Sequence, residues 1–115
     1  MKVQAKAFSR RGNYVKAFPL YRQLAEGGDS ESMVSLAYMY YNGWGVDKDY
    51  GEALKWFEKA AAAGDAVGML GMGFMYENGR GVPKDMAMAT DWYRKSANPG
   101  NEAAKENLRR LGLTR

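Results

Sequence analysis

Apolar side chains recur every three or four residues along most of the chain, which is the spacing of amphipathic helices. The pattern is clearest in residues 30–42, where Met33, Leu36 and Tyr40 carry it. An Asn-Gly pair closes this segment, and glycine suits the left-handed position that ends many helices. Together with its flanking cap residues, the pattern predicts seven helices, at residues 2–10, 14–26, 30–42, 50–62, 66–78, 86–97 and 102–111.

The same pattern returns after 36 residues, so the chain is internally repetitive. Residues 30–65 and 66–101 align without a gap and are identical at 14 of 36 positions, where chance gives about two or three. Each copy predicts two antiparallel helices joined by a glycine-containing loop. The sequence therefore predicts a single all-α solenoid domain over residues 1–115, with a shortened repeat (1–29), two full repeats (30–65 and 66–101) and a C-terminal capping helix segment (102–115).

Residue size within the repeat predicts how its two helices pack. Ala37 and Gly73 fall on the inner face of the first helix, opposite an alanine-rich second helix. Small side chains at these positions let two helix backbones approach closely, which offsets the cost of glycine within a helix, about 1 kcal/mol. Trp56 and Trp92 recur at equivalent positions, and we expect both to be largely buried beside the small residues.

Composition limits the chemistry of such a solenoid. The formal net charge is +4, and cysteine and histidine are both absent. This excludes disulfides, thiolate or histidine-dependent nucleophiles and the usual zinc ligands. The glycine-rich segments do not follow a strand and complete no phosphate-binding motif. We therefore expect no enzyme activity, no cofactor and no metal site.

Two features bear on the compartment of the protein. No apolar segment follows Met1 and Lys2, so the sequence itself predicts no signal peptide. The longest uncharged stretch, residues 66–76, is too short to span a bilayer. Neither feature assigns a localisation.

The repeated motif resembles the Sel-one-like repeat, the 36-residue relative of the tetratricopeptide repeat. In the first full copy the matching positions are Leu36, Ala37, Tyr40, Gly43, Gly45, Val46, Asp49, Ala53, Trp56, Phe57, Ala60, Ala61 and Gly64. The departures are alanine for glycine at position 37, Ser96, and the pair Asn98-Pro99. The resemblance implies a right-handed α-solenoid of helical hairpins that acts as a non-catalytic adaptor, scaffold or partner-neutralising protein. It also implies that the protein is bacterial. We expect it to be periplasmic or exported, and otherwise cytoplasmic.

In such a solenoid the first helix of each repeat lines the concave side, and some of its positions are not needed for packing within the repeat. These positions are Val34, Tyr38, Tyr41, Asn42, Leu70, Phe74, Glu77 and Asn78. Basic residues stand toward the two ends of the chain, at Lys2, Lys6, Arg10 and Arg110. We expect the apolar and aromatic positions to form the floor of a groove with basic ends. Such a groove suits a protein or peptide segment that carries acidic residues, and nothing indicates a homo-oligomer.

Two alternative functions remain open at this stage. One is a hydrolase acting on cell-wall or related material through carboxylates, since no histidine or cysteine is available. The other is weak binding of single-stranded nucleic acid by stacking on Tyr38, Tyr41 and Phe74. The modest net charge and the glutamates interspersed among the basic residues weigh against a nucleic-acid partner, and we do not expect one.

Overall fold

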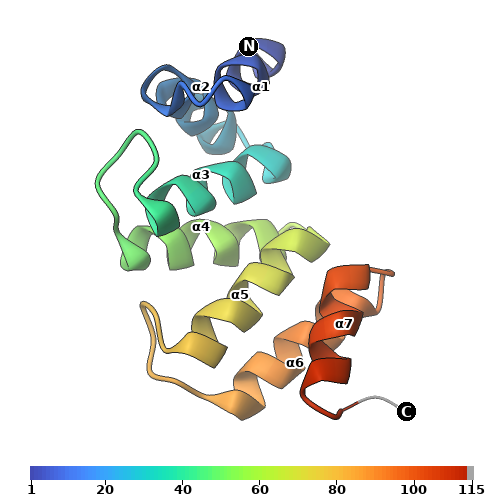
Figure 1. Ribbon diagram of the computed structural model, residues 1–115. Coiled ribbons are helices and arrows are strands. Elements are labelled where there is room, and N and C mark those ends of the chain that lie inside the picture. The colour runs from blue at the N-terminus through green and yellow to red at the C-terminus, as the bar shows by residue number, and fades with distance from the viewer. Residues whose placement is uncertain (114–115) are drawn as a thin grey trace.

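The computed structural model describes residues 1–113, which form seven helices joined by short loops (Figure 1). The helices are α1 (Lys2–Arg10), α2 (Tyr14–Glu26), α3 (Ser30–Asn42), α4 (Tyr50–Ala62), α5 (Ala66–Asn78), α6 (Met86–Ala97) and α7 (Glu102–Arg110). Their bounds match the prediction, except that α7 ends one residue earlier than expected. The predicted all-α solenoid is confirmed. Residues 114–115 of the predicted capping segment lie outside the described residues.

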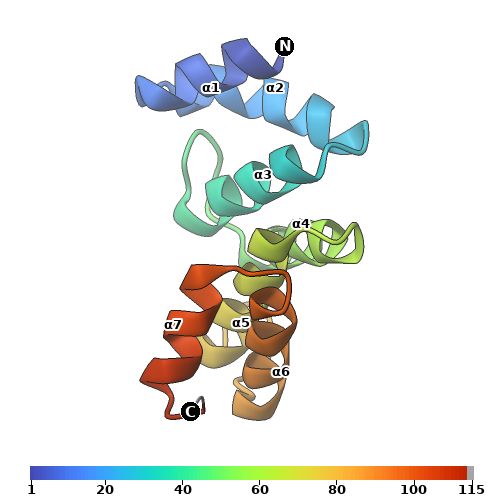
Figure 2. The same ribbon diagram turned by 90° about the vertical axis from the view of Figure 1, so that its right-hand side faces the viewer.

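The helices form a layered stack, with α1 and α7 at opposite ends (Figure 2). Each helix packs on the next one along the chain, and α3 also contacts α5. In Figure 2, α7 lies to the left of α5 and α6. We call the side carried by α3, α5 and α7 the first-helix face, because each is the first helix of its repeat.

Polar side chains start the helices at the predicted caps. Each cap accepts a hydrogen bond from a backbone N–H two or three residues further on, which satisfies a donor that the helix leaves free. The caps of α3 to α7 are Asp29, Asp49, Asp65, Asp85 and Asn101. The first helices end as predicted, with Gly43 (φ 72°) and Gly79 (φ 64°) in the left-handed conformation.

The loop after each first helix packs back onto the preceding repeat. A Cβ atom at Gly45 would overlap the backbone of Tyr14, and one at Gly81 would lie 2.8 Å from the carbonyl oxygen of Tyr50. Both glycines have φ of 74°. These two loop glycines are therefore required by backbone conformation and by close approach together, and they join each repeat to the one before it.

The glycine-rich α5 is explained by large side chains that lie against its backbone. A Cβ atom at Gly71 would collide with the ring of Phe57, and one at Gly73 would collide with the ring of Tyr93. Phe57 and Tyr93 are almost fully buried, and so is Ala37, the residue equivalent to Gly73. The predicted close packing of small residues against the second helices is confirmed. Packing of the two aromatic rings against the α5 backbone offsets the low helix propensity of glycine.

The two tryptophans differ in burial, which corrects one expectation. Trp56 is 6% exposed and belongs to the main core cluster, as predicted. Trp92 is only partly buried and packs against the margin of that cluster. The Lys95 ammonium lies over its ring, 4.5 Å from the centroid. Equivalent positions in the repeat therefore do not have equivalent burial.

A buried serine replaces an alanine of the motif in the second full repeat. Ser96 is equivalent to Ala60, and both are fully buried. The Ser96 hydroxyl donates a hydrogen bond of 2.6 Å to the carbonyl oxygen of Ala66, at the start of α5. The departure from the motif thus ties α6 to the first turn of α5, and the buried hydroxyl is satisfied.

Candidate functional site

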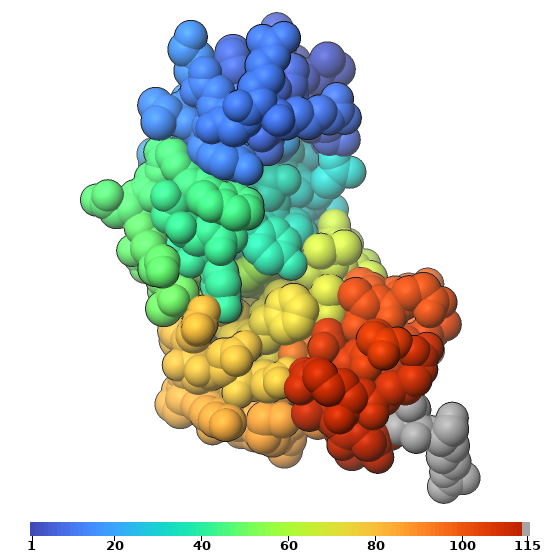
Figure 3. Space-filling model, viewed as in Figure 1, coloured from blue at the N-terminus to red at the C-terminus, as the bar shows by residue number. Residues whose placement is uncertain are grey.

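The first-helix face carries a hollow of about 290 Å³ at the boundary between the two full repeats. We call it the central hollow, and its lining residues are Tyr38, Tyr41, Asn42, Phe57, Phe74 and Asn78. They come from α3, α4 and α5, and Figure 3 shows α5, in yellow, open to view between α3 and α7. All of them except Phe57 were predicted as site residues. Phe57 was identified only as a core position of the motif, so the sequence did not reveal its second role.

Aromatic rings form the floor of the central hollow in a repeated geometry. Tyr38 meets Phe57 edge to face, with centroids 5.1 Å apart and planes at 86°. One repeat later, Phe74 meets Tyr93 at 6.0 Å and 72°. Burial, with a smaller contribution from nearby Tyr41, raises the pKa of Tyr38 above its ordinary value. Tyr38 therefore presents a neutral hydroxyl group and an apolar ring at any physiological pH.

Two equivalent asparagines provide polar groups at the central hollow. The Asn42 side-chain N–H donates to the carbonyl oxygen of Tyr38 at 3.0 Å, and that of Asn78 donates to the carbonyl oxygen of Phe74 at 2.9 Å. Both side chains are exposed. Each amide is thus held in place by its own helix, while its oxygen and its second N–H are left for another partner.

A second hollow of about 350 Å³ lies one repeat earlier and shares the Tyr38 wall. We call it the upper hollow, and its lining residues are Ser9, Tyr14, Tyr21, Ser35, Tyr38, Met39 and Trp44. Tyr21 and Tyr38 stand 36 positions before Phe57 and Phe74, so the two hollows share two equivalent lining positions. Tyr14 and Trp44 stack at its edge, 4.9 Å between centroids and 16° between planes. Trp44, like Arg80 below, was not predicted as a site residue.

Two predicted floor residues are core instead. Val34 is 7% exposed and Leu70 is 6% exposed, so neither is available to a partner. Val34 packs within the main cluster with residues of α2 and α4, whereas Leu70 packs with Ala104 and Leu108 of α7. They lie one helical turn before Tyr38 and Phe74, where neighbouring helices cover the first helices. The expectation that they form an open floor was wrong.

Glu77 and Arg110 were predicted as partner-binding residues, but they bind each other. An Arg110 guanidinium N–H donates to the Glu77 carboxylate at 2.7 Å, and the Tyr93 hydroxyl donates to the same oxygen at 2.6 Å. Burial raises the pKa of Glu77, but the hydrogen bonds from Arg110 and Tyr93 outweigh it, so the pKa is lowered overall. Burial, followed by the bond to Glu77, raises the pKa of Tyr93 far above its ordinary value. This triad of Glu77, Tyr93 and Arg110 therefore links α5, α6 and α7.

The basic stripe on α1 is also largely neutralised within the chain. Lys2 lies 3.2 Å from Asp29 and 3.6 Å from Glu31, and Lys6 lies 2.8 Å from Glu31. The hydrogen bond from Ser32 is the main cause that lowers the pKa of Asp29. Lys2 and Lys6 therefore hold α1 against the start of α3 and do not form a free basic end. Of the predicted stripe, Arg10 is exposed and forms no ion pair within residues 1–113.

The guanidinium group of Arg80 lies beside the central hollow. Arg80 was not predicted as a site residue. Its guanidinium donates a hydrogen bond of 2.7 Å to the Tyr41 hydroxyl. It lies over two rings, 5.3 Å from the centroid of Tyr41 and 5.4 Å from that of Tyr50. The repeat contained the signal: Arg80 is equivalent to Trp44, and Tyr50 is equivalent to Tyr14, on which Trp44 stacks.

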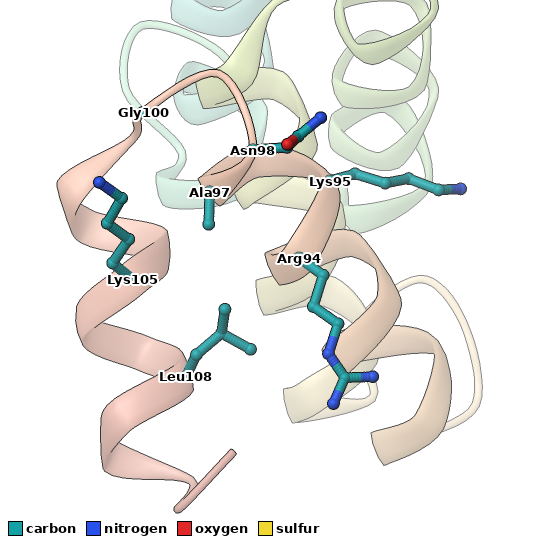
Figure 4. Close-up of a pocket in the computed structure, with 7 residues that line it drawn as sticks. All are labelled: Arg94, Lys95, Ala97, Asn98, Gly100, Lys105 and Leu108. Atoms are coloured by element: carbon teal, nitrogen blue, oxygen red, sulfur yellow. The ribbon is translucent and has the colours of Figure 1, made fainter. Parts of the chain in front are cut away.

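A larger groove of about 590 Å³ lies between α6 and α7 (Figure 4). Its lining residues are Arg94, Lys95, Ala97, Asn98, Gly100, Lys105 and Leu108. In Figure 4 the Leu108 side chain points into the space between the two helices, at the base of the groove. Lys105 pairs with Glu102 at 3.3 Å. The groove contains one large apolar side chain and no aromatic ring, unlike the central hollow.

Within residues 1–113, no group of three or more cysteine, histidine, aspartate or glutamate side chains is placed to hold a metal ion. None of the helices in this range is both long and apolar enough to cross a membrane.

Stacked helical hairpins in a 36-residue register define an α-solenoid of the tetratricopeptide-like class. The Sel1 repeat matches residues 7–29, 30–65 and 66–101, so the chain belongs to the Sel1 repeat family. The resemblance noted in the sequence is thereby confirmed. No curated protein matches the chain.

Three solved structures, all of bacterial proteins, are similar to the chain. The c5321 protein of uropathogenic Escherichia coli, a protective antigen with an SLR fold, is 38% identical, with a TM-score of 0.79 over 83% of this chain. A Sel1 repeat protein from Oxalobacter formigenes is 32% identical, with a TM-score of 0.85 over 91%. Cysteine-rich protein B of Helicobacter pylori is 29% identical, with a TM-score of 0.75 over 81%. The chain spans 20%, 43% and 70% of the three, respectively.

Proposed function

We propose that the chain is a non-catalytic module that binds a segment of a protein partner on its first-helix face, mainly at the central hollow. The Sel1 repeat fold is a type of protein-interaction scaffold, which supports the general role. The observation that carries the specific proposal is the hollow itself, where aromatic rings of α3, α4 and α5 line an open space. Aromatic anchors in such pockets supply most of the affinity of an interface.

The rival hydrolase function has weaker support. A carboxylate that acts as general acid needs a raised pKa, so that it holds its proton near neutral pH. Glu77 is half-buried, yet its pKa is lowered and two donors already occupy one of its oxygens. The triad is therefore better suited to holding helices together than to transferring protons. Nucleic-acid binding gains little from the predicted basic ends, because Lys2, Lys6 and Arg110 are paired with carboxylates.

The proposal is tested first by locating the contact surface. A photo-crosslinking amino acid at position 78, on the rim of the central hollow, should capture a protein from bacterial extract. The same amino acid at position 55, an exposed residue of α4, should not capture that protein. The affinity of the captured protein can then be measured with purified variants.

Tyr38→Ala and Phe74→Ala should each weaken binding of that protein at least about thirtyfold. Val67→Ala removes an exposed apolar side chain of α5 outside the hollow and should leave the affinity unchanged. Circular dichroism melting must show that each variant is folded, since both rings also contact neighbouring aromatics. Folded alanine variants that bind like the wild type would show that the contact lies elsewhere.

A further inference from the structure

The guanidinium group of Arg80 is positioned to recognise an anionic group of a partner. It is half-buried and lies over two neighbouring tyrosine rings, with one N–H committed to the Tyr41 hydroxyl. A guanidinium has five N–H donors, so stacking and one hydrogen bond leave donors free along its edge. Because Tyr41 lines the central hollow, its hydrogen bond places the Arg80 guanidinium beside the lining of that hollow.

The other cations considered for partner binding are mostly committed within the chain. Lys2 and Lys6 pair with carboxylates of α3 and its cap, and Arg110 pairs with Glu77. Within residues 1–113, no carboxylate lies within ion-pair distance of Arg80. A half-buried cation without an intramolecular carboxylate is therefore the charge that the central hollow offers to a ligand.

The two asparagines indicate how the rest of the ligand is held. Each amide is fixed by its own helix and retains an acceptor oxygen and one donor, the complement of a peptide N–H and C=O. Asn42 and Asn78 line the same hollow and come from successive repeats. An extended peptide exposes such main-chain groups, whereas a helix has already paired them internally.

We propose that the partner is an extended segment in which an acidic side chain stands next to a large apolar one. The apolar side chain fills the central hollow, Arg80 binds the carboxylate, and Asn42 and Asn78 bind the main chain. This rests on the function proposed above, and it moves the recognition of acidic groups from the ends of the chain to the middle of the first-helix face.

The chain supplies its own control for Arg80. Trp44 occupies the equivalent position one repeat earlier and stacks on Tyr14, while the Arg80 guanidinium lies over the ring of Tyr50, the equivalent of Tyr14. Arg80→Trp therefore retains a planar group on the Tyr50 ring while it removes the charge and its donors. It should preserve the loop and the melting temperature better than Arg80→Ala.

The test begins with a displayed library of random linear peptides selected on the whole wild-type chain. Enriched peptides should carry aspartate or glutamate beside a large apolar residue, relative to the starting library. One such peptide is then synthesised with its acidic residue and with the matching amide, and its affinity is measured by fluorescence anisotropy. The amide should bind the wild type roughly tenfold more weakly, because a charge-assisted bond is lost.

Arg80→Trp should bind the two synthetic peptides equally, and it should bind the acidic one about as weakly as the wild type binds the amide. If enriched peptides require Tyr38 and Phe74 but show no acidic preference, or if Arg80→Trp retains the full preference, the role of Arg80 is refuted while the proposed binding site stands. If no peptide is enriched, or if the enriched ones bind Tyr38→Ala and Phe74→Ala normally, the proposed site fails, and the role of Arg80 fails with it.

Discussion

We call the contact between one repeat and the next a joint. Two successive joints share one backbone arrangement but carry different side-chain chemistry. The joint between the two full repeats surrounds the open central hollow with aromatic rings. At the next joint the equivalent side chains bond to one another and close the gap. The equivalent pairs are Tyr41 and Glu77, Phe57 and Tyr93, and Phe74 and Arg110.

The difference shows how a repeat solenoid can divide its tasks. A ring from each joint packs on a glycine of α5, Phe57 on Gly71 and Tyr93 on Gly73. The rim residues differ, because the uncharged side chains of Tyr41 and Phe74 are replaced by Glu77 and Arg110, a hydrogen-bonded acid and base. Polar groups that satisfy one another fix a single arrangement of helices. Uncharged rings around a cavity leave apolar surface available to a ligand.

The largest effect is expected from removing the closed joint altogether. Deleting all residues after Pro99 removes α7 and uncovers Leu70 and Tyr93, which are now 6% and 0% exposed. Because a terminal unit must cover the core of its neighbour, the shortened chain should aggregate or lose helical structure. Light scattering after size-exclusion chromatography, together with circular dichroism, measures this. A monomeric shortened chain with the remaining six helices intact would show that α7 is not a required cap.

The next largest effect concerns the two rings that anchor the joints. Phe57→Ala and Tyr93→Ala should each lower the free energy of unfolding by about 3–5 kcal/mol, because both side chains are almost fully buried. Tyr93→Phe keeps the ring and removes only the hydroxyl that binds Glu77, so it should cost less, about 1–2 kcal/mol. Urea denaturation provides the comparison. Equal losses for Tyr93→Ala and Tyr93→Phe would mean that the hydrogen bond, rather than packing, holds this joint.

A smaller, pH-dependent effect distinguishes the closed joint from the open one. The pKa of Glu77 is lowered from its ordinary value of 4.5, so the folded state favours the ionised carboxylate. Its contribution to stability is complete above that value and is lost as the pH falls through the folded-state pKa. Glu77→Gln should therefore destabilise the chain by about 1–3 kcal/mol at neutral pH. The gap between variant and wild type should narrow below pH 4.5. A gap that stays constant across acid pH would contradict this linkage.

The smallest effect is expected at the rim of the open joint. Arg80→Trp replaces one planar group stacked on Tyr50 with another, and should change the free energy of unfolding by less than about 0.5 kcal/mol. The reciprocal change, Trp44→Arg on Tyr14, should be similarly mild. Thermal melting of both variants provides the measurement. A large loss in either would mean that the rim is structural and that the open joint is less free to bind than its geometry indicates.

The sequence predicted most of the fold because its signals are local. Helix bounds follow from the apolar period, from caps such as Asp49, and from glycines such as Gly43, and they agree with the structure to within one residue. The 36-residue register predicted the hairpin stack, and it placed Tyr38 and Phe74 at equivalent sites around one hollow. These features depend on residue type and spacing, which a sequence displays directly.

Only the tertiary structure decided which of the predicted positions remain available. Val34 lies one turn from Tyr38 on the same helix, yet one is core and the other lines the hollow. Helical periodicity assigns residues to a face of a helix, but the neighbouring helices decide how much of that face they cover. Likewise, the charges of Glu77 and Arg110 are visible in the sequence, 33 residues apart, and only the packing of α7 against α5 brings them within 2.7 Å.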